Sequence, residues 1–313
     1  MTTTLRRFRF GVQISRTRTS QEWKDQAGRA EALGYDTFLM PDHFGRQFAI
    51  GPALALVAEA TERLRIGTLV WQNDLRHPAL AAMEAATLDV LSEGRFELGI
   101  GAGGSFPPEY EWTGIAFDSA SVRVQRLEES IWILKGLAGD DQFSFSGTYF
   151  SLKDYQANPK PIQKPYPPLL IAGGGKRMLS LAGREADIVA ILPRMLPGNA
   201  GFADDETSLE AFASKVEFVK GVAGDRFAEL EFNLLIQMVK VTDDRNGEID
   251  RLKQEHEISD DDWFDSPMVF VGSVDEVVDR IREVRERTGV SYFVVFEPVM
   301  EAFSPIVAAL AGQ

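Results

Sequence analysis

The chain has 313 residues, of which 44% are hydrophobic and 26% are charged, and its net charge at pH 7 is −14. An acidic surface of this kind argues against nucleic acid and anionic membranes as partners. The sequence contains no cysteine, which excludes disulfides, thiolate catalysis and thiolate-bound metals. An all-histidine metal site would need all 3 histidines, and no apolar stretch approaches membrane-spanning length. We therefore expect a cytosolic globular protein that holds no metal.

The first hundred residues alternate between strand-like and helix-like segments at a regular spacing. Thr19 and Glu22 have the spacing of a capping box, and Pro78 stands where a helix tolerates proline in its first turn. Helices between successive strands require parallel pairing with right-handed crossovers. The predicted strands are residues 8–15, 35–40, 64–71 and 95–100, and the predicted helices are residues 20–33, 52–61 and 78–91.

This rhythm breaks after the fourth strand and then resumes. Residues 105–117 are rich in aromatic residues and proline and predict a long loop over the strand ends. An amphipathic helix at 119–137, a small hairpin about Gly147 and a proline-rich segment at 155–168 follow. The remaining predicted strands are residues 168–172, 187–192, 230–241 and 292–296, with helices after 176, at 209–222, at 273–289 and after Pro305.

The pattern predicts one α/β domain over residues 1–313, a (β/α)8 TIM barrel with an insertion between strands four and five. A doubly wound open sheet is the alternative. In a barrel the C-terminal ends of all strands share one face, where active sites form. Polar and glycine residues gather at the predicted ends: Gln13, Ser15, Asp42, His43, Gln72, Asn73, Gly101, Ala102, Gly103, Gly104, Gly173, Gly174, Gly175, Lys176, Arg177, Pro193, Arg194, Gln237 and Glu297.

Two of these strand ends predict ligand contacts. The turn from Gly173 to Arg177 opens a helix, where backbone N–H groups and the helix dipole suit a phosphate, although a plain turn is the alternative. Gly99, Gly101 and Gly104 satisfy G-x-G-x-x-G, but they follow the fourth strand and do not lead straight into a helix. They favour close backbone approach to a flat ligand rather than a dinucleotide site.

His43 is the only histidine at a predicted strand end, which makes it the candidate acid/base. Asp42 beside it could orient the imidazole or bond to the backbone instead. The alternative for His43 is a structural histidine held by Asp42 or by backbone groups.

A series of short motifs, in this order, resembles the bacterial luciferase-like flavin- or F420-dependent oxidoreductases over essentially the whole chain. The resemblance is strongest to the branch that uses coenzyme F420, a deazaflavin. The motifs are D-H-F at 42–44, R-H-P at 76–78, G-R-F-E-L-G-I-G-A-G at 94–103, G-T-Y-F at 147–150, A-D-I-V at 186–189 and V-G-S at 271–273.

The resemblance implies a TIM barrel with the cofactor at the C-terminal face, and a homodimer. Asp42 and His43 would lie beside the deazaflavin ring, and Leu69 and Val70 would flank a non-prolyl cis peptide behind it. The other implied contacts are Gln72 and Asn73 to the ring edge or ribityl chain, Gly101, Ala102, Gly103 and Gly104 along the cofactor chain, and Gly173, Gly174, Gly175, Lys176 and Arg177 at the phosphate.

The implied reaction is hydride transfer between the deazaflavin and a small, apolar substrate, with His43 managing the accompanying proton. Relatives that oxidise glucose-6-phosphate have a glutamate where this chain has Gly104, so we do not expect that activity. An FMN-dependent monooxygenase on the same fold and a non-catalytic binding protein are the alternatives. Loops 105–117 and 195–206 are expected to shape the substrate pocket, which would be lined by Phe44, Leu69, Trp71, Phe106 and Trp112.

Overall fold

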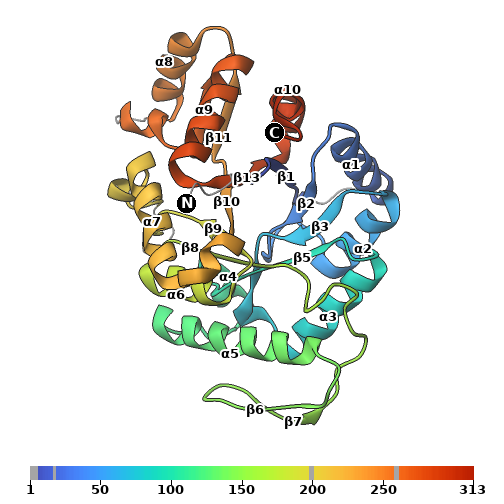
Figure 1. Cartoon of the computed structure of the whole chain (residues 1–313). Helices are drawn as coiled ribbons and strands as arrows, with labels where there is room; N and C mark the ends of the chain where they lie inside the picture. Colours follow the sequence, from blue (N-terminus) through green and yellow to red (C-terminus); the bar gives the residue numbers. More distant parts are fainter. Residues whose placement is uncertain (1–5, 17–18, 197–200, 257–260) are drawn as a thin grey trace.

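A closed barrel of parallel strands forms the centre of the computed structural model, which describes residues 6–16, 19–196, 201–256 and 261–313 (Figure 1). Within these residues the barrel strands are β1 (Arg9–Gln13), β2 (Thr37–Met40), β3 (Arg65–Thr68), β5 (Phe96–Gly101), β8 (Leu169–Gly173), β9 (Ile188–Ile191), β10 (Glu231–Leu235) and β13 (Val290–Phe296). They pair in the order β3, β2, β1, β13, β10, β9, β8, β5, and a further β3–β5 pairing closes the ring. The predicted TIM barrel is confirmed, and the open doubly wound sheet is wrong.

Helices cover the outside of this barrel (Figure 1). The main ones are α1 (Ser20–Ala32), α2 (Ile50–Ala60), α3 (Pro78–Leu91), α5 (Ala120–Ala138), α6 (Lys176–Glu185), α7 (Leu209–Ala223), α9 (Val274–Thr288) and α10 (Met300–Leu310). The predicted capping box at Thr19 and Glu22 is confirmed, because each side chain bonds to the other's backbone N–H. Short 3-10 turns are η1 (Asn73–Leu75), η3 (Asp204–Glu206), η4 (Gly224–Glu229) and η6 (Glu297–Val299). Over the described ranges, none of the helices is both long enough and apolar enough to span a membrane.

The last helix starts earlier than the sequence predicts. We expected it after Pro305, but α10 begins at Met300 and carries Pro305 inside it. Proline has no N–H to offer the carbonyl one turn before it, which is that of Glu301. The Ser304 hydroxyl donates to this carbonyl at 2.9 Å instead, so the helix continues through the proline.

Charged side chains close the barrel interior at the N-terminal ends of the strands. We call this group the floor, and its members are Arg9, Arg65, Glu97 and Glu231. The Glu97 carboxylate accepts from both arginines, with 2.5 Å to the Nε of Arg65, and Arg9 also donates to Glu231 at 2.6 Å. Burial acts to raise the pKa of Glu97, but Arg9 and Arg65 outweigh it and hold that pKa below its ordinary value. The floor therefore pairs each of its charges with an opposite one.

The predicted third strand is interrupted near its end. After β3 the peptide bond between Leu69 and Val70 is cis, as the resemblance implied, and the short β4 (Trp71–Gln72) then pairs with β5. A Cβ on Gly99 of β5 would lie 1.9 Å from the Thr68 carbonyl oxygen. Only glycine lets the two backbones come this close.

The segment between β5 and β8 contains more structure than a loop and a helix. The part of 105–117 predicted as an irregular loop holds a short helix, α4 (Pro108–Thr113), which has too few residues to show a helical period. The predicted hairpin about Gly147 is confirmed as β6 (Phe143–Ser146) and β7 (Ser151–Tyr155). Glu129 of α5 fastens its turn by accepting from the backbone N–H groups of residues 148, 149 and 150.

The predicted seventh strand, 230–241, is two strands in two different sheets. β10 belongs to the barrel, whereas β11 (Met238–Val241) pairs with β12 (Val269–Gly272) in a small parallel sheet. The change takes place between two consecutive amides, since Ile236 N–H donates to Val294 and Gln237 N–H donates to Met268. The continuous apolar run hid this break and β12. The helix α8 (Arg245–His256) and the turn η5 (Asp261–Asp265) lie between the strands in sequence, and α8 lies at one end of the molecule in Figure 1.

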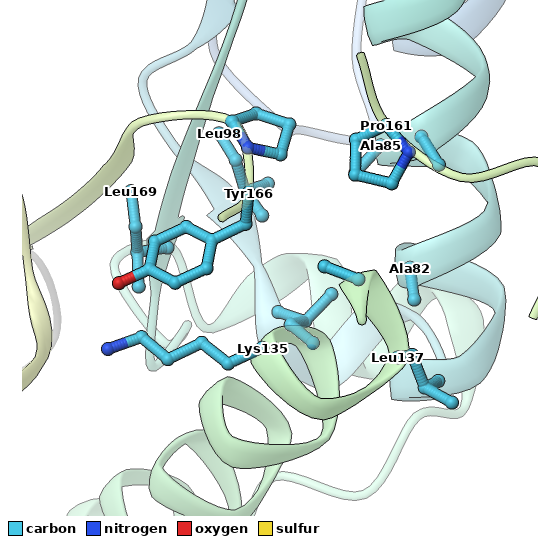
Figure 2. Close-up of a pocket in the computed structure, with 12 residues that line it drawn as sticks. Ala82, Ala85, Leu98, Lys135, Leu137, Pro161, Tyr166 and Leu169 are labelled. Carbon is cyan, nitrogen blue, oxygen red and sulfur yellow. The ribbon is translucent and has the colours of Figure 1, made fainter. Parts of the chain in front are cut away.

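A small apolar cavity of about 30 Å³ lies between α3, α5 and the proline-rich crossover (Figure 2). The α3 side is formed by alanines such as Ala82 and Ala85, which are too short to fill the gap toward Leu137. Lys135 lies at one side, with its Nζ 5.2 Å from the centre of the Tyr166 ring. An apolar space of about one water's size stays dry, so this is a packing gap rather than a polar site.

Candidate active site

His43, just beyond the C-terminal end of β2, is hydrogen-bonded to an acid that the sequence analysis did not select. Its Nδ1 lies 2.7 Å from Oε1 of Glu109, in the first turn of α4. The Glu109 side chain is 2% exposed, whereas that of His43 is 39% exposed. Among the described residues, Nε2 of His43 has no hydrogen-bond partner, so this nitrogen is free to meet a ligand.

Asp42 takes the second of its two expected roles and bonds to the backbone. Its Oδ2 accepts from the Gln72 N–H at 2.9 Å and from Nη1 of Arg76 at 2.6 Å. The carboxylate therefore fixes β4 beside β2 and does not orient the imidazole of His43. Asp42 supports the wall of the site, and Glu109 is the carboxylate that contacts the histidine.

Gln72 and Asn73, which were predicted to contact the ring edge or ribityl chain, differ in whether their amide nitrogens already have hydrogen-bond partners. The Gln72 amide nitrogen donates to the Asp42 carbonyl at 2.5 Å and to Oε2 of Glu109 at 2.9 Å. Gln72 therefore links the segment after β2 to the helix α4. Asn73 is 3% exposed, and its Nδ2 is a buried donor without a partner in the described structure. An unpaired buried donor is costly, and a ligand acceptor is one group that could pair it, although Nε1 of Trp71 is buried without a partner in the described structure as well.

The glycines after β5 make a turn that other residues could not. Gly103 and Gly104 have φ of +75° and +83°, in the left-handed region. A Cβ on Gly104 would lie 2.4 Å from the Arg123 guanidinium, and one on Gly101 would lie 2.9 Å from the Val70 side chain. A glutamate at position 104 would therefore need a different turn. Position 104 is thus a glycine by necessity of the turn, and the acid that reaches the site is Glu109, which comes from α4.

A cavity of about 450 Å³ adjoins His43 and Glu109, and we call it the aromatic cavity. Phe106 and Trp112 form one wall, with ring centres 5.6 Å apart in an edge-to-face arrangement. Leu69 and Trp71, which were expected to line it, do not, since Leu69 packs inside the barrel and Trp71 is fully buried against Phe96. The lining residues are His43, Phe44, Gly45, Ser105, Phe106, Glu109 and Trp112.

The predicted phosphate turn borders a second, larger space of about 650 Å³. α6 begins after Gly175 without any side-chain cap, so its first N–H groups are available to an anion. Gly174 must be glycine, since a Cβ there would lie 2.4 Å from the Leu192 carbonyl oxygen. Lys215 donates to the Gly174 carbonyl at 2.8 Å, and sequence reasoning missed this residue because it lies far along the chain on α7.

Two of the other charges that line this second space, Glu206 and Arg194, are paired within the protein, whereas Lys176 has no ion-pair partner in the described structure. Glu206 accepts from Nζ of Lys215 at 2.6 Å and from Nε of Arg194 at 3.1 Å. Arg177 of α6 donates to the Ser121 hydroxyl of α5 rather than lying free. Of the predicted loop at 195–206, residues 197–200 lie outside the described residues, and the rest does not line the aromatic cavity.

Curated relatives carry two kinds of printed activity. The chain is 34% identical over 188 residues to an F420-dependent glucose-6-phosphate dehydrogenase of Microbacterium testaceum, which covers 57% of this chain and 55% of that protein. It is 28% identical over 312 residues to the 4-hydroxyprotoasukamycin monooxygenase of Streptomyces nodosus subsp. asukaensis, covering 89% and 79%. For the first two curated relatives the match thus spans about half of their length.

Solved structures show the same fold at low identity. An F420-dependent secondary alcohol dehydrogenase in complex with an F420-acetone adduct aligns with a TM-score of 0.78, 21% identity, and 97% and 99% coverage of the two chains. A long-chain alkane monooxygenase aligns with a TM-score of 0.79, 14% identity, and 98% and 92% coverage. The family model for luciferase-like monooxygenases matches residues 3–292, and the chain belongs to that family.

Proposed function

We propose that this protein is an F420-dependent oxidoreductase that transfers a hydride between the deazaflavin and a small apolar alcohol or the matching carbonyl compound. One observation carries the proposal. His43 is bonded through Nδ1 to a buried carboxylate, and its other ring nitrogen is free beside the aromatic cavity. Oxidation of an alcohol releases a proton together with the hydride, and this pair is suited to accept it.

The donor set at the strand ends fits such a cofactor. The unpaired Nδ2 of Asn73 suits a polar ring edge, and the bare turn at Gly103 and Gly104 allows close approach of a chain. The uncapped N-terminus of α6 beside Gly174 and Gly175 suits a phosphate. When bound, the deazaflavin supplies the carbon that accepts or donates hydride.

The chain's own residues would manage the proton. With Nδ1–H donated to Glu109, Nε2 of His43 presents a lone pair and can accept the hydroxyl proton. The imidazolium that results is stabilised by the buried Glu109 carboxylate, which also keeps the ring in one orientation. In carbonyl reduction the same proton would move from Nε2 to the forming alkoxide.

The walls of the aromatic cavity support a neutral substrate. Phe44, Phe106 and Trp112 supply apolar surface, and none of the residues that line the cavity is a lysine or an arginine. Arg76, which follows β4 near this wall, is paired with Asp42. A phosphorylated sugar would therefore find no charged partner in this cavity.

Cofactor titration followed by turnover tests the proposal. F420 added to the purified protein should show quenched fluorescence, and a panel of secondary alcohols should then bleach its absorbance at a rate that depends on the protein. Tight binding of FMN without binding of F420 would overturn the choice of cofactor. Glucose-6-phosphate serves as the charged comparison substrate and should give no turnover.

An FMN-dependent monooxygenase is the second candidate. It is favoured by the match over 89% of this chain to a relative with that printed class of activity. Oxygen consumption in the presence of reduced FMN and a hydrophobic substrate would support it. The same titration thus separates the two candidates.

We further propose that the protein is a homodimer that pairs through the outer face of α3. Leu80 and Met83 are exposed there, followed about two to three turns later by Val90 and Leu91. A stripe of large apolar side chains on one helix face suits a partner surface. Light scattering should give twice the chain mass for the native protein and a lower mass for Met83→Glu, whereas a monomeric native protein would refute this part.

A further inference from the structure

The carboxylate that contacts His43 is carried by a helix too short to hold itself in place. α4 has 6 residues, and an isolated helix of this length is unstable in water. Glu109 and Tyr110 are both about 2% exposed, although Trp112 on the same helix is 64% exposed. Glu109 bonds to His43 and Gln72 through its own carboxylate, and the short helix that carries it is held in addition by contacts of its buried neighbour Tyr110.

Tyr110 makes these contacts through its hydroxyl group. The hydroxyl donates to Oδ2 of Asp74 at 3.0 Å and lies 3.5 Å from Oε1 of Gln72. Its ring packs edge-to-face on Phe117 at 4.8 Å between centres. Burial and the Asp74 carboxylate raise the pKa of Tyr110 above its ordinary value, so the hydroxyl stays a donor.

Asp74 is itself anchored from a different element. Its side chain is 1% exposed and lies 3.4 Å from Nε of Arg126 and 3.8 Å from Nε of Arg123, both on α5. The hydroxyl of Tyr110 therefore connects α4 to a buried charged group held by the long helix α5. Of the two neighbouring residues of α4, Glu109 thus bonds to Gln72 in β4 and Tyr110 bonds to Asp74 in the turn that follows β4.

The same hydroxyl borders the glycine turn after β5. A Cβ on Gly103 would lie 2.5 Å from the Tyr110 hydroxyl oxygen and 3.1 Å from Oδ2 of Asp74. The backbone of Gly103 is consequently packed against the two groups that form the Tyr110–Asp74 hydrogen bond. A single bond thus supports the turn assigned to the cofactor chain and the helix that carries Glu109.

We propose that Tyr110 is a positioning residue whose hydrogen bond to Asp74 holds Glu109 against Nδ1 of His43 and so fixes the histidine in the Nδ1–H tautomer. The effect on catalysis rests on the proposed function, but the tautomer is a property of the protein alone. With Tyr110 untethered, α4 loses its bond to Asp74 and Glu109 is held only through Gln72 and His43, so the carboxylate can shift and the imidazole can take up its other neutral tautomer.

Nitrogen-15 NMR of the ring nitrogens tests this directly in the protein without cofactor. The chain has 3 histidines, so a spectrum of His43→Gln assigns the His43 signals by subtraction. We expect the Nδ1–H pattern in the native protein and a mixture of tautomers in Tyr110→Phe, which keeps the ring and removes only the hydroxyl. An unchanged pattern in Tyr110→Phe would overturn the proposal.

Two further variants act on the other end of the bond. Asp74→Ala removes the acceptor and should disturb the tautomer as Tyr110→Phe does, whereas Asp74→Asn keeps an acceptor oxygen and should restore the native pattern. Tyr149→Phe is the matched control, because within the described residues its hydroxyl bonds to the exposed Gln125 side chain alone, at 2.8 Å. If Asp74→Ala disturbed nothing, the proposal would be refuted even if Tyr110→Phe failed to fold.

Turnover separates this inference from the proposed function. Tyr110→Phe should lower kcat about tenfold with little change in KM, since a misplaced proton acceptor slows chemistry more than binding. A shifted tautomer in a protein without F420 turnover would refute the proposed function and support the positioning role. Normal kcat and tautomer in an active Tyr110→Phe protein would refute the positioning role alone.

Discussion

The two ends of the barrel interior use polar residues in opposite ways. At the floor, Arg9, Arg65, Glu97 and Glu231 are all paired with opposite charges. At the other end, Asn73 keeps a buried donor without a partner in the described structure, and His43 keeps a free ring nitrogen beside a cavity. We infer that the paired charges of the floor contribute stability and that the end with His43 contributes the binding and chemistry proposed above, as this fold generally divides them.

The largest expected effect is at the catalytic end. His43→Ala should lower turnover by about 10²- to 10⁴-fold, because it removes the proposed proton acceptor. Its thermal unfolding should stay close to that of the native protein, since the side chain is partly exposed. Turnover and a melting curve on the same preparation check this. Full turnover in the variant would refute the proposed role of His43 as the proton acceptor.

The floor should show the reverse behaviour. Glu97→Ala leaves two arginines facing each other without their shared carboxylate and should reduce the free energy of unfolding by about 3 kcal/mol. Urea denaturation measures the loss, and F420 binding by the folded fraction should be unchanged. Glu301→Ala breaks an exposed pair with Arg29 and serves as the control, with little change expected.

The pH dependence of the floor follows from the lowered pKa of Glu97. A carboxyl whose pKa is lower in the folded state stabilises the fold above its unfolded pKa, near 4.5, and loses this effect as the pH falls through its folded value. The difference in unfolding free energy between the native protein and Glu97→Gln should therefore be largest near neutral pH and shrink in acid. A difference that grew toward acid pH would contradict the assignment.

A smaller effect is expected in the glycine turn of the catalytic end. Gly104→Ala forces an alanine into φ of +83° and against Arg123, at a cost of about 1–2 kcal/mol, and it should also weaken cofactor binding. Gly221→Ala is the matched control, since that glycine lies in α7 with open space around it. The control should stabilise the protein by up to about 1 kcal/mol. Equal melting temperatures for the two variants would argue against a special turn at Gly104.

The smallest effect concerns the packing gap between α3 and α5, away from both ends. Ala85→Val should partly fill the 30 Å³ cavity and raise stability by up to about 1 kcal/mol. Ala85→Thr has the same shape but places a hydroxyl among apolar side chains, and it should be less stable than the valine variant. The difference in unfolding free energy between the two variants measures the packing of this gap, and neither cofactor binding nor turnover should change.

The barrel could be predicted because its signals are local. Each strand and helix shows its own period, and the capping box at Thr19 and the first-turn Pro78 lie within a few residues of the helix starts they mark. The glycine runs and the Asp42–His43 pair could also be found, since they follow directly on strands. Even the cis peptide at Leu69 and Val70 came from a short motif series.

The features that were missed depend on contacts between distant parts of the chain. Glu109 lies 66 positions after His43 and is carried by a helix without a visible period, so nothing local marks it. The pairing of Asp42 with Arg76 instead of His43 likewise depends on how β4 lies beside β2. A run of apolar residues from 230 to 241 carries no sign that consecutive amides bond to different sheets.

That change of sheet after β10 has a consequence for how the protein could be remodelled. Ile236 ends the barrel ladder, Gln237 begins the β11–β12 sheet, and these two sheets share no strand pairing in the described structure. The β11–β12 sheet nevertheless packs against the barrel, because Val239, Met268 and Phe270 belong to the main hydrophobic core and the Phe270 ring lies edge-to-face on Phe293 of β13. Remodelling the β11–β12 sheet would therefore leave the hydrogen-bonded ring of eight strands intact only if the side chains that pack against the barrel are kept.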